Sequence, residues 1–420
     1  MSRKFEIQGG KPLAGSYPVQ GNKNAALPLI CASLLVPGRY AFTRVPQILD
    51  VRRLVELTGA LGVKTQWRSD RLEMDTSTLR WGKLPEETVE QLRGAVLLLG
   101  AVAERFEAVR SPLPGGCPIG RRSFDVHWRV FESAGFSVQE SDREVRLKKQ
   151  KKPARPEIFL EESSVTATEN ALLLYAACGA GKIYNPAREP HIFSLIQFLE
   201  RIGCRIDARP LFFEVRQGAQ SRHDPVEFEV PPDLVDAGTI AAATGACGGS
   251  VLLQGVTRPD LLGIEPILAK FGIDFQWKTD SVVSVESSGG SNPTKVTAGP
   301  WPLFPTDLVS LAVVLATQKK GLCLVHDWMY ESRMFFVDKL IRMGARITMC
   351  DPHRVLVEGP SSLRGTRLES PDIRAGMALV VAGLCAQGTT CIEHAEVIMR
   401  GYEQIIERFE GIGASIRERL

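Results

Sequence analysis

The sequence lacks the features of a membrane protein and those of several common enzyme classes. Its longest apolar runs, such as 378–386, fall far short of the roughly 20 residues that a membrane span requires. It has no G-x-x-x-x-G-K-[ST] loop and no G-x-G-x-x-G loop, so the usual support for nucleotide hydrolysis or dinucleotide redox chemistry is missing. Residues 1–8 contain no apolar segment of a secretory signal, so we expect a cytoplasmic protein that contacts no membrane.

Metal-site spacing and a strong charge of one sign are also missing. The nine cysteines include no C-x-x-C pair, and the six histidines are scattered, so we expect neither a metal ion nor a Ser-His-Asp triad. Most cysteines fall in apolar helical stretches, which is typical of reduced, buried thiols rather than of disulfides. The net charge of +3 gives no general case for binding nucleic acid. The cysteines in apolar stretches are Cys31, Cys178, Cys247 and Cys385.

What the sequence does contain is an internal repeat of about 70 residues. In each copy an amphipathic helix ends in a hydrophobic-Gly step, and an alternating strand follows. Each glycine is predicted to stop its helix in the left-handed conformation that glycine adopts without steric cost. The six glycines are Gly62, Gly135, Gly203, Gly272, Gly344 and Gly413.

A second helix, rich in small apolar residues, recurs in the same frame. Because it is apolar all round it belongs inside, whereas the amphipathic helix belongs outside. At 420 residues the chain exceeds the size of a single core. We therefore predict an α/β (α+β) fold of six repeats in two inside-out α/β barrel domains, 23–230 and 1–22 plus 231–420. The apolar helices are predicted at 25–35, 95–103, 170–178, 238–247, 308–316 and 376–385.

One loop, 113–122, combines three glycines and two prolines around Cys117. This composition indicates an exposed loop of special conformation, and the two arginines that follow would favour the thiolate. Cys117 is thus a candidate for proton transfer or for nucleophilic attack. The alternative is a free cysteine in a turn.

A polar loop, 20–24, opens directly into the first apolar helix and carries Lys23. A helix N-terminus already presents positive charge, so a lysine there indicates an anion between the two. The alternative is a solvated lysine beside an Asn cap.

Arginines and acids recur at the joints between repeats. Arg93, Arg122, Arg374 and Arg400 occupy comparable places, and a ligand with phosphate and carboxylate groups needs several such bidentate partners. Asp307 and Asp372 are each predicted at the N-cap of a buried helix, and an acid in that place can also accept a substrate proton. The six strongest candidates for catalysis are Cys117, Asp307, Lys23, Arg122, Asp372 and Arg400.

These residues lie in motifs that resemble those of the UDP-N-acetylglucosamine 1-carboxyvinyltransferase family, over essentially the whole chain. The related 5-enolpyruvylshikimate-3-phosphate synthases lack the cysteine loop. The resemblance implies transfer of the enolpyruvyl group of phosphoenolpyruvate to the 3′-hydroxyl of UDP-N-acetylglucosamine, with release of phosphate, for peptidoglycan synthesis. The motifs are Gly21-Asn22-Lys23-Asn24-Ala25-Ala26-Leu27-Pro28, Leu113-Pro114-Gly115-Gly116-Cys117-Pro118-Ile119-Gly120, Ala187-Arg188-Glu189-Pro190, Phe304-Pro305-Thr306-Asp307, Glu331-Ser332-Arg333 and Arg400-Gly401-Tyr402-Glu403.

The resemblance also implies roles for single residues. Cys117 would be the general acid, and Asp307 would take the hydroxyl proton. Lys23, Arg122 and Arg400 would bind phosphoenolpyruvate, and Asp372 with Arg374 would support the step. It implies no cofactor. Together, the substrate-binding set is Lys23, Asn24, Arg93, Arg122, Ser123, Phe124, Asp125, Val126, Glu162, Ser163, Ser164, Val165, Asp307, Met329, Arg374 and Arg400.

Five positions depart from the family pattern, and they keep other hypotheses open. The chain could use another acceptor, or it could be an inactive regulator that binds a nucleotide sugar. A repeat scaffold that only binds partners is a further alternative. We expect a monomer or a weak homo-oligomer. The departures are Glu162, Thr166, His191, Leu234 and Met399.

Overall fold

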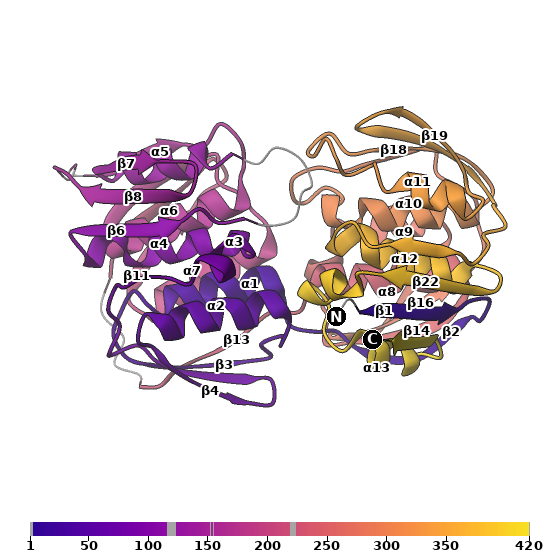
Figure 1. Ribbon diagram of the computed structural model, residues 1–420, viewed down its shortest axis with the longest axis horizontal. Helices are drawn as coiled ribbons and strands as arrows, with labels where there is room; N and C mark the ends of the chain where they lie inside the picture. Colours follow the sequence, from indigo (N-terminus) through magenta and orange to yellow (C-terminus); the bar gives the residue numbers. More distant parts are fainter. Residues whose placement is uncertain (1–2, 116–122, 152, 154, 219–223, 420) are drawn as a thin grey trace. The chain divides into compact units, whose positions relative to one another are not determined.

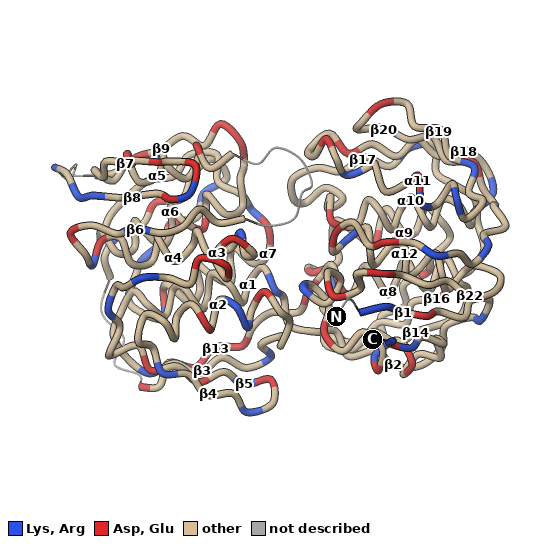
Figure 2. Tube along the Cα trace, in the orientation of Figure 1, with Lys and Arg blue, Asp and Glu red and all other residues tan. Residues whose placement is uncertain are grey.

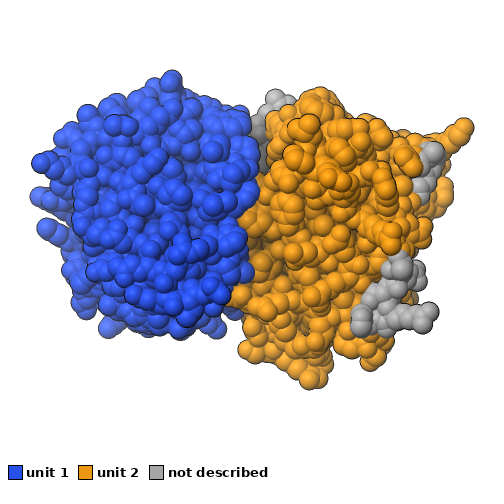
Figure 3. All heavy atoms as spheres, turned by 180° about the vertical axis from the view of Figure 1, so that it is seen from behind, with its two compact units in different colours: residues 1–20, 117–121, 232–420 blue, residues 21–116, 122–231 orange. Residues whose placement is uncertain are grey.

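The computed structural model describes residues 3–115, 123–151, 153, 155–218 and 224–419. The described chain divides into two compact units, which Figure 3 colours separately. Unit 1 holds residues 3–20 and 232–419, and unit 2 holds residues 21–115 and 123–231. Two of the predicted catalytic residues, Cys117 and Arg122, lie outside the described residues.

Six apolar helices form the two cores, as the repeat predicts. Their side chains are almost all buried, and within each unit the three helices contact one another. Figure 1 shows them in the interior of each unit, with the sheets outside. Those of unit 2 are α1 (Lys23–Ala32), α4 (Val96–Val102) and α6 (Val165–Cys178), and those of unit 1 are α8 (Leu234–Cys247), α10 (Val309–Gln318) and α12 (Ile373–Cys385).

The amphipathic helices end as predicted, each followed by a glycine with positive φ. These φ angles are 85°, 85°, 103°, 74°, 100° and 86° at Gly62, Gly135, Gly203, Gly272, Gly344 and Gly413, which confirms the left-handed stop. The helices are α2 (Leu49–Ala60), α5 (Asp125–Ser133), α7 (Pro190–Arg201), α9 (Glu265–Ala269), α11 (Val337–Arg342) and α13 (Ile405–Glu410); the short α3 (Glu86–Glu90) precedes the loop of Cys117.

Within the described residues, unit 2 contains three sheets. Two have four strands and one has three, and each joins the strand after an apolar helix to the hairpin after an amphipathic one. The strand orders are β13 (Val226–Glu229), β3 (Arg39–Thr43), β5 (Arg71–Asp75), β4 (Lys64–Arg68); β6 (Ala108–Pro112), β8 (Glu144–Lys149), β7 (Phe136–Glu140); and β11 (Cys204–Ala208), β12 (Phe212–Gln217), β10 (Ala180–Tyr184), β9 (Glu157–Phe159).

The described part of unit 1 contains three four-stranded sheets of the same pattern. In one of them the N-terminal strand β1 pairs antiparallel with two C-terminal strands. The orders are β21 (Arg367–Glu369), β22 (Thr389–Glu393), β1 (Lys4–Gln8), β23 (Ser415–Arg419); β15 (Ile273–Thr279), β16 (Val282–Ser287), β14 (Gly249–Gln254), β2 (Leu13–Pro18); and β17 (Lys295–Thr297), β18 (Gly321–His326), β20 (Arg354–Gly359), β19 (Arg346–Asp351).

Two strands precede the points where the chain passes from one unit to the other. β2 pairs in parallel with β14 of unit 1, and α1 of unit 2 follows it. β13 pairs in parallel with β3 of unit 2, and α8 of unit 1 follows it. The N–H of Asp233 donates to the carbonyl of Gln20 at 2.9 Å, and the N–H of Asn22 donates to the carbonyl of Pro231 at 2.8 Å. The two segments in which the chain passes between the units, 20–22 and 231–233, are therefore joined by backbone hydrogen bonds.

Thiols and charges follow the expectations in part. The eight described cysteines are free, but of the four expected in buried helices only Cys31 is fully buried. Cys247 and Cys385 are half-buried, with their sulfurs 3.3 Å apart. Lys and Arg, and Asp and Glu, are distributed over both units (Figure 2). Within the described part of the chain, no helix has the length and apolar character needed to cross a membrane.

Candidate active site

In unit 2, Lys23 is the first residue of α1. The side chain of Asn22 caps this helix, because its Oδ1 accepts from the N–H groups of Asn24 at 2.8 Å and Ala25 at 3.2 Å. Lys23 Nζ lies 3.2 Å from Asp50 Oδ2, and the two side chains are only 14% and 5% exposed. Lys23 therefore lies beside an Asn cap, as the alternative expected, but its side chain is mostly buried against a carboxylate of the protein rather than solvated.

Asp50 connects Lys23 to the start of the Cys117 loop. Arg53 of α2 lies 3.8 Å from Asp50 Oδ1 and also donates to Gln91, which follows α3. Gly115 packs against α3 itself: its N–H donates to the carbonyl of Val89 at 3.4 Å, and a Cβ on Gly115 would lie only 1.7 Å from the carbonyl oxygen of Glu90. Glycine is required there by this close approach.

Arg93, in the 3-10 turn η1 (Arg93–Ala95), contacts the first described residues after the loop. Its Nη2 donates to the carbonyl of Ser123 at 3.2 Å, and its guanidinium lies 4.2 Å from the ring centroid of Phe124. The cation–π contact and the hydrogen bond together hold Ser123 and Phe124 against η1. Of the predicted substrate-binding segment 123–126, Phe124 and Val126 are half-buried, and Ser123 and Asp125 are exposed.

A buried histidine joins this segment to the start of α6. Both ring nitrogens of His127 make hydrogen bonds: Nε2 lies 3.2 Å from Thr166 Oγ1, and Nδ1 lies 2.9 Å from Asn170 Nδ2. Burial, with a smaller effect of Arg93, lowers the pKa of His127 to about 3, so the ring is neutral. Since the Nδ2 group of Asn170 is a donor, Nδ1 is the acceptor and Nε2 carries the proton.

The predicted segment 162–165 leads into the same helix. Ser164 caps α6 by accepting from the N–H of Ala167 at 3.4 Å, and Ser163 Oγ donates to Asn185 Oδ1 at 3.0 Å. Glu162 is exposed. The structure therefore brings Arg93, segment 123–126 and segment 162–165 together through Phe124, His127 and Thr166.

In unit 1, Asp307 is held by two buried arginines. Its Oδ1 accepts from Arg333 Nη2 at 3.2 Å, and its Oδ2 accepts from Arg374 Nη2 at 2.8 Å. The arginine side chains are 1% and 7% exposed, and that of Asp307 is 27% exposed. Burial lowers the pKa of Arg374, but Asp307, Tyr402 and Asp233 outweigh it and raise that pKa. Both guanidiniums stabilise the ionised carboxylate.

The predicted N-cap role of Asp307 is wrong. The residue lies inside a 3-10 turn, η4 (Thr306–Leu308), so α10 begins two residues later at Val309, and its N-cap Leu308 makes no side-chain capping bond. The carboxylate is directed to the arginines instead. Asp372 does cap α12: its Oδ1 accepts from the N–H groups of Arg374 at 2.7 Å and Ala375 at 3.0 Å.

Two more predicted residues adjoin this cluster. Arg400 ends the 3-10 turn η5 (Ala395–Arg400), and a Cβ on the next residue, Gly401, would lie 2.5 Å from Ile373 Cγ2 and 3.6 Å from Arg374 Nη1. Arg400 is thus next in sequence to a residue packed on the start of α12. Met329 N–H donates to Asp327 Oδ1 at 2.9 Å.

Several residues of the site were missed by sequence reasoning. Arg333 is the second partner of Asp307; it lies within Glu331-Ser332-Arg333, but an arginine alone gives no sign that it is buried. Asp327 is fully buried, lies 3.8 Å from Arg333 Nε and accepts from Thr306. The sequence marks Asp50 only as an acidic residue in the first turn of α2, which does not indicate that it pairs with Lys23.

The departures from the family pattern lie in different surroundings. His191 is buried with Nε2 3.7 Å from Glu169 Oε1, and burial, then Glu189, raises the pKa of Glu169. Leu234 is part of the unit 1 core, and Met399 Sδ accepts from Arg3 at 3.6 Å. Thr166 contacts His127, the residue after the predicted segment 123–126, and Glu162 is itself one of the residues predicted to bind substrate.

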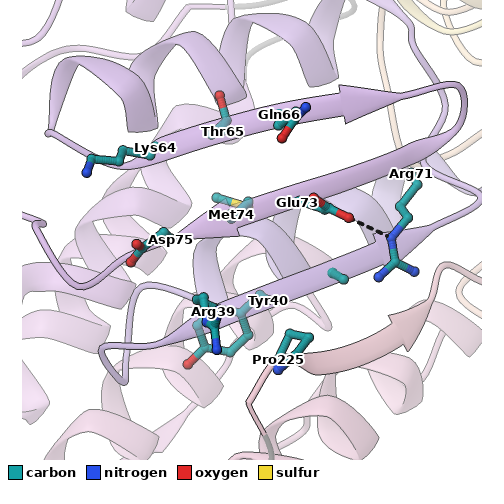
Figure 4. Close-up of a pocket in the computed structure, with 11 residues that line it drawn as sticks. Arg39, Tyr40, Lys64, Thr65, Gln66, Arg71, Glu73, Met74, Asp75 and Pro225 are labelled. Carbon is teal, nitrogen blue, oxygen red and sulfur yellow. Dashed lines mark hydrogen bonds and ion pairs between the residues drawn. The ribbon is translucent and has the colours of Figure 1, made fainter.

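A surface hollow of about 360 Å³ lies elsewhere in unit 2, on strands β3, β4 and β5 (Figure 4). Two of its arginines are paired, Arg71 with Glu73 at 3.1 Å and Arg39 with Asp224 at 3.0 Å. The described residues that line it include none of those predicted to act. Among the residues described, no group of three or more His, Cys, Asp or Glu has the arrangement of a metal site.

Comparison with known sequences shows the family. Residues 7–409 match the family described as EPSP synthase (3-phosphoshikimate 1-carboxyvinyltransferase). A UDP-N-acetylglucosamine 1-carboxyvinyltransferase of Bradyrhizobium diazoefficiens is 38% identical, covering 99% of this chain and 97% of its own. One from Treponema denticola is 36% identical over 98% of both chains. The chain therefore belongs to the EPSP synthase family of enolpyruvyl transferases.

Solved structures show the same fold. The enolpyruvyl transferase NikO from Streptomyces tendae matches with a TM-score of 0.89 at 22% identity, covering 99% of both chains. An EPSP synthase from Acinetobacter baumannii matches with a TM-score of 0.73 at 16% identity over the whole of both chains. The mixed α/β fold expected from the repeat is thus that of enolpyruvyl transferases.

Proposed function

We propose that this protein transfers the enolpyruvyl group of phosphoenolpyruvate to the 3′-hydroxyl of UDP-N-acetylglucosamine, releases phosphate, and so supplies a precursor of peptidoglycan. One observation carries the proposal: relatives of that name are 35–38% identical over nearly the whole chain. The residue sets of the two units support it, because each contains charged groups of the kind that this reaction needs.

Phosphoenolpyruvate carries a phosphate and a carboxylate, so it needs several cations. Lys23, Arg122 and Arg400 are assigned to it. Lys23 is supported by its place at the N-terminus of α1, where backbone N–H groups add to the positive potential. Asp50 holds the ammonium group in place until the substrate anion arrives.

Asp307 is the base in this proposal. As the 3′-hydroxyl oxygen attacks C2 of phosphoenolpyruvate, its proton passes to the carboxylate, and Cys117 donates a proton to the C3 methylene. Loss of phosphate from the tetrahedral intermediate, with loss of a C3 proton, then gives the enol ether. By its family resemblance, Cys117 would also be able to form a covalent adduct with the substrate.

Arg374 and Asp372 support this step from the start of α12. Asp372 fixes the helix N-terminus by capping it, and Arg374 in the first turn holds Asp307 Oδ2 at 2.8 Å. Arg333 holds the other oxygen. The carboxylate therefore has a fixed orientation before substrate binds, which is a requirement of efficient proton transfer.

The nucleotide sugar is assigned to residues that lie mostly in unit 2. Arg93 and Phe124 form a cation–π pair, and His127 ties segment 123–126 to the N-terminus of α6. Asn24, at the start of α1, has its N–H bonded to Asn22 and is half-buried. The full set is Asn24, Arg93, Arg122, Ser123, Phe124, Asp125, Val126, Glu162, Ser163, Ser164, Val165 and Met329.

The finer description of the fold is also a proposal. We infer that the two units are inside-out α/β barrels of three repeats each, spanning 23–230 and 1–22 plus 231–420; the buried apolar helices and the repeated sheet pattern support this. The protein would act as a monomer or weak homo-oligomer in the cytoplasm, on small-molecule substrates alone.

The experiment measures phosphate release from phosphoenolpyruvate with and without UDP-N-acetylglucosamine. Release is expected only when both are present, and the Cys117→Ala variant should lose it. No release by folded wild-type protein would refute the proposed function. Full turnover by Cys117→Ala would refute only the role of the cysteine.

A further inference from the structure

Gln20 is a buried glutamine at the point where the chain leaves unit 1. It is 6% exposed. Its Nε2 donates to the carbonyl of Gly401 at 3.1 Å and to Asp233 Oδ2 at 3.4 Å, and its Oε1 accepts from the N–H of Glu403 at 3.0 Å and from Arg408 Nη1 at 2.9 Å. Both donors and both acceptor positions of the amide are therefore used.

This arrangement also fixes which way the amide points. Rotating it by half a turn would place Oε1 against a carbonyl and a carboxylate, and Nε2 against two N–H donors. All four contacts would become repulsive, so a single orientation is stable. Neither glutamate nor an apolar residue can reproduce this set of donors and acceptors.

The segment that Gln20 holds is irregular backbone directly after Arg400. Gly401 and Tyr402 are buried, and they lie between η5 and α13. Gln404, which follows, has a φ of 44°, a conformation that is costly for a residue with a side chain. Buried backbone groups outside a helix or sheet need other partners. Gln20 supplies one to the carbonyl of Gly401 and one to the N–H of Glu403.

Gln20 is itself held in place by charged groups. Its N–H donates to Asp236 Oδ2 at 3.0 Å, and Arg408 Nη2 donates to the same oxygen at 2.9 Å. Tyr17 donates to Asp236 Oδ1 at 2.8 Å, and the guanidinium of Arg408 lies 4.2 Å from the Tyr17 ring centroid. Hydrogen bonds therefore hold both the backbone and the side chain of Gln20, so the amide has a fixed position beside residues 401–403.

We propose that Gln20 is a positioning residue that orients Arg400 for binding phosphoenolpyruvate. The inference rests on the role proposed above for Arg400, which Gln20 serves by holding the carbonyl of Gly401 and the N–H of Glu403. A displaced segment would move the Arg400 side chain, and small displacements of a substrate-binding group reduce rate strongly. The residues assigned to the nucleotide sugar in unit 2 do not depend on this support.

Two variants test the inference. Gln20→Glu keeps the shape but replaces the Nε2 donors with an oxygen facing Asp233, and Gln20→Met keeps most of the volume but loses all four bonds. Gln276→Glu is the matched control, because Gln276 is exposed on β15 of the same unit. For each protein, KM for phosphoenolpyruvate, KM for UDP-N-acetylglucosamine and kcat are measured. Amide hydrogen exchange is followed in residues 401–404.

In both Gln20 variants we expect KM for phosphoenolpyruvate to rise by about tenfold or more, with KM for UDP-N-acetylglucosamine changed by less than about twofold. Exchange in residues 401–404 should be faster, and the control should match wild type. An unchanged KM for phosphoenolpyruvate, or an equal rise in both constants, would overturn the inference. If wild type has no activity, the proposed function fails by itself; unchanged exchange in Gln20→Met would then overturn the positioning role as well.

Discussion

Replacing Asp307 with asparagine removes the negative charge between two buried arginines and should separate its catalytic role from its structural one. Removing one partner of a buried ion pair typically costs about 3 to 5 kcal/mol. Here the cost should be lower. Arg333 keeps Asp327 at 3.8 Å, Arg374 keeps the favourable charge of Asp233, and Asp307 itself is 27% exposed. We expect a loss of about 2 kcal/mol in the free energy of unfolding.

Activity should fall far more than this stability loss explains. Loss of a general base costs about a hundredfold to ten-thousandfold in rate. A decrease of about 2 kcal/mol leaves a protein of ordinary stability almost wholly folded at 25 °C. Turnover by Asp307→Asn should therefore be at least about a hundredfold slower in a fully folded sample.

The assay combines urea denaturation with phosphate release at saturating substrates. Asp338→Asn is the control, because Asp338 is 60% exposed and pairs with Lys339 at 3.3 Å. Surface pairs contribute little, so this variant should keep the stability and rate of wild type. If folded Asp307→Asn retained turnover within about tenfold of wild type, the assignment of Asp307 as the base would be wrong.

Three further predictions concern stability and substrate binding. Gly62→Ala should lower the free energy of unfolding by about 1 to 2 kcal/mol because φ is 85° there. Gly59→Ala should raise it by up to about 1 kcal/mol, because Gly59 lies in the last turn of α2 and an added Cβ would meet no atom within 4 Å. Equal effects in urea denaturation would contradict this. Because burial lowers the pKa of His127 to about 3, the unfolded chain binds a proton at His127 between pH 6.5 and 3 that the folded chain does not. As the pH is lowered through that range, the free energy of unfolding should fall by up to about 1.4 kcal/mol per pH unit. Urea denaturation across the range should show this slope for wild type and not for His127→Gln. Lys23→Met should leave Asp50 short of a partner, lower stability by about 1 to 3 kcal/mol and raise KM for phosphoenolpyruvate, whereas Lys23→Arg should restore stability; unchanged kinetics in the first variant would contradict the role of Lys23.

The repeat could be predicted because its signals are local. A glycine that must adopt positive φ and a helix without polar residues are each visible within about a dozen residues of sequence. The six helix stops and six buried helices were therefore located correctly. The pairing of β2 with β14 and of β13 with β3 leaves no such signal, because each of these strands pairs with a strand far along the chain.

The site shows the same limit. Asp307 was predicted as a cap from its neighbours in sequence, but the 3-10 turn moves the helix start, and its partners lie 26 and 67 residues away. Asp372, whose capping bonds reach only two and three residues ahead, was predicted correctly. The burial of Arg333 and the pairing of Lys23 with Asp50 required the folded chain.

The most direct measurement of the central claim is mass spectrometry of the product formed from phosphoenolpyruvate and UDP-N-acetylglucosamine, with phosphate quantified in the same sample. We predict one enolpyruvyl ether of the nucleotide sugar for each phosphate released, and none from the Cys117→Ala variant. Phosphate without the ether, or an ether formed only with a different acceptor, would contradict the account.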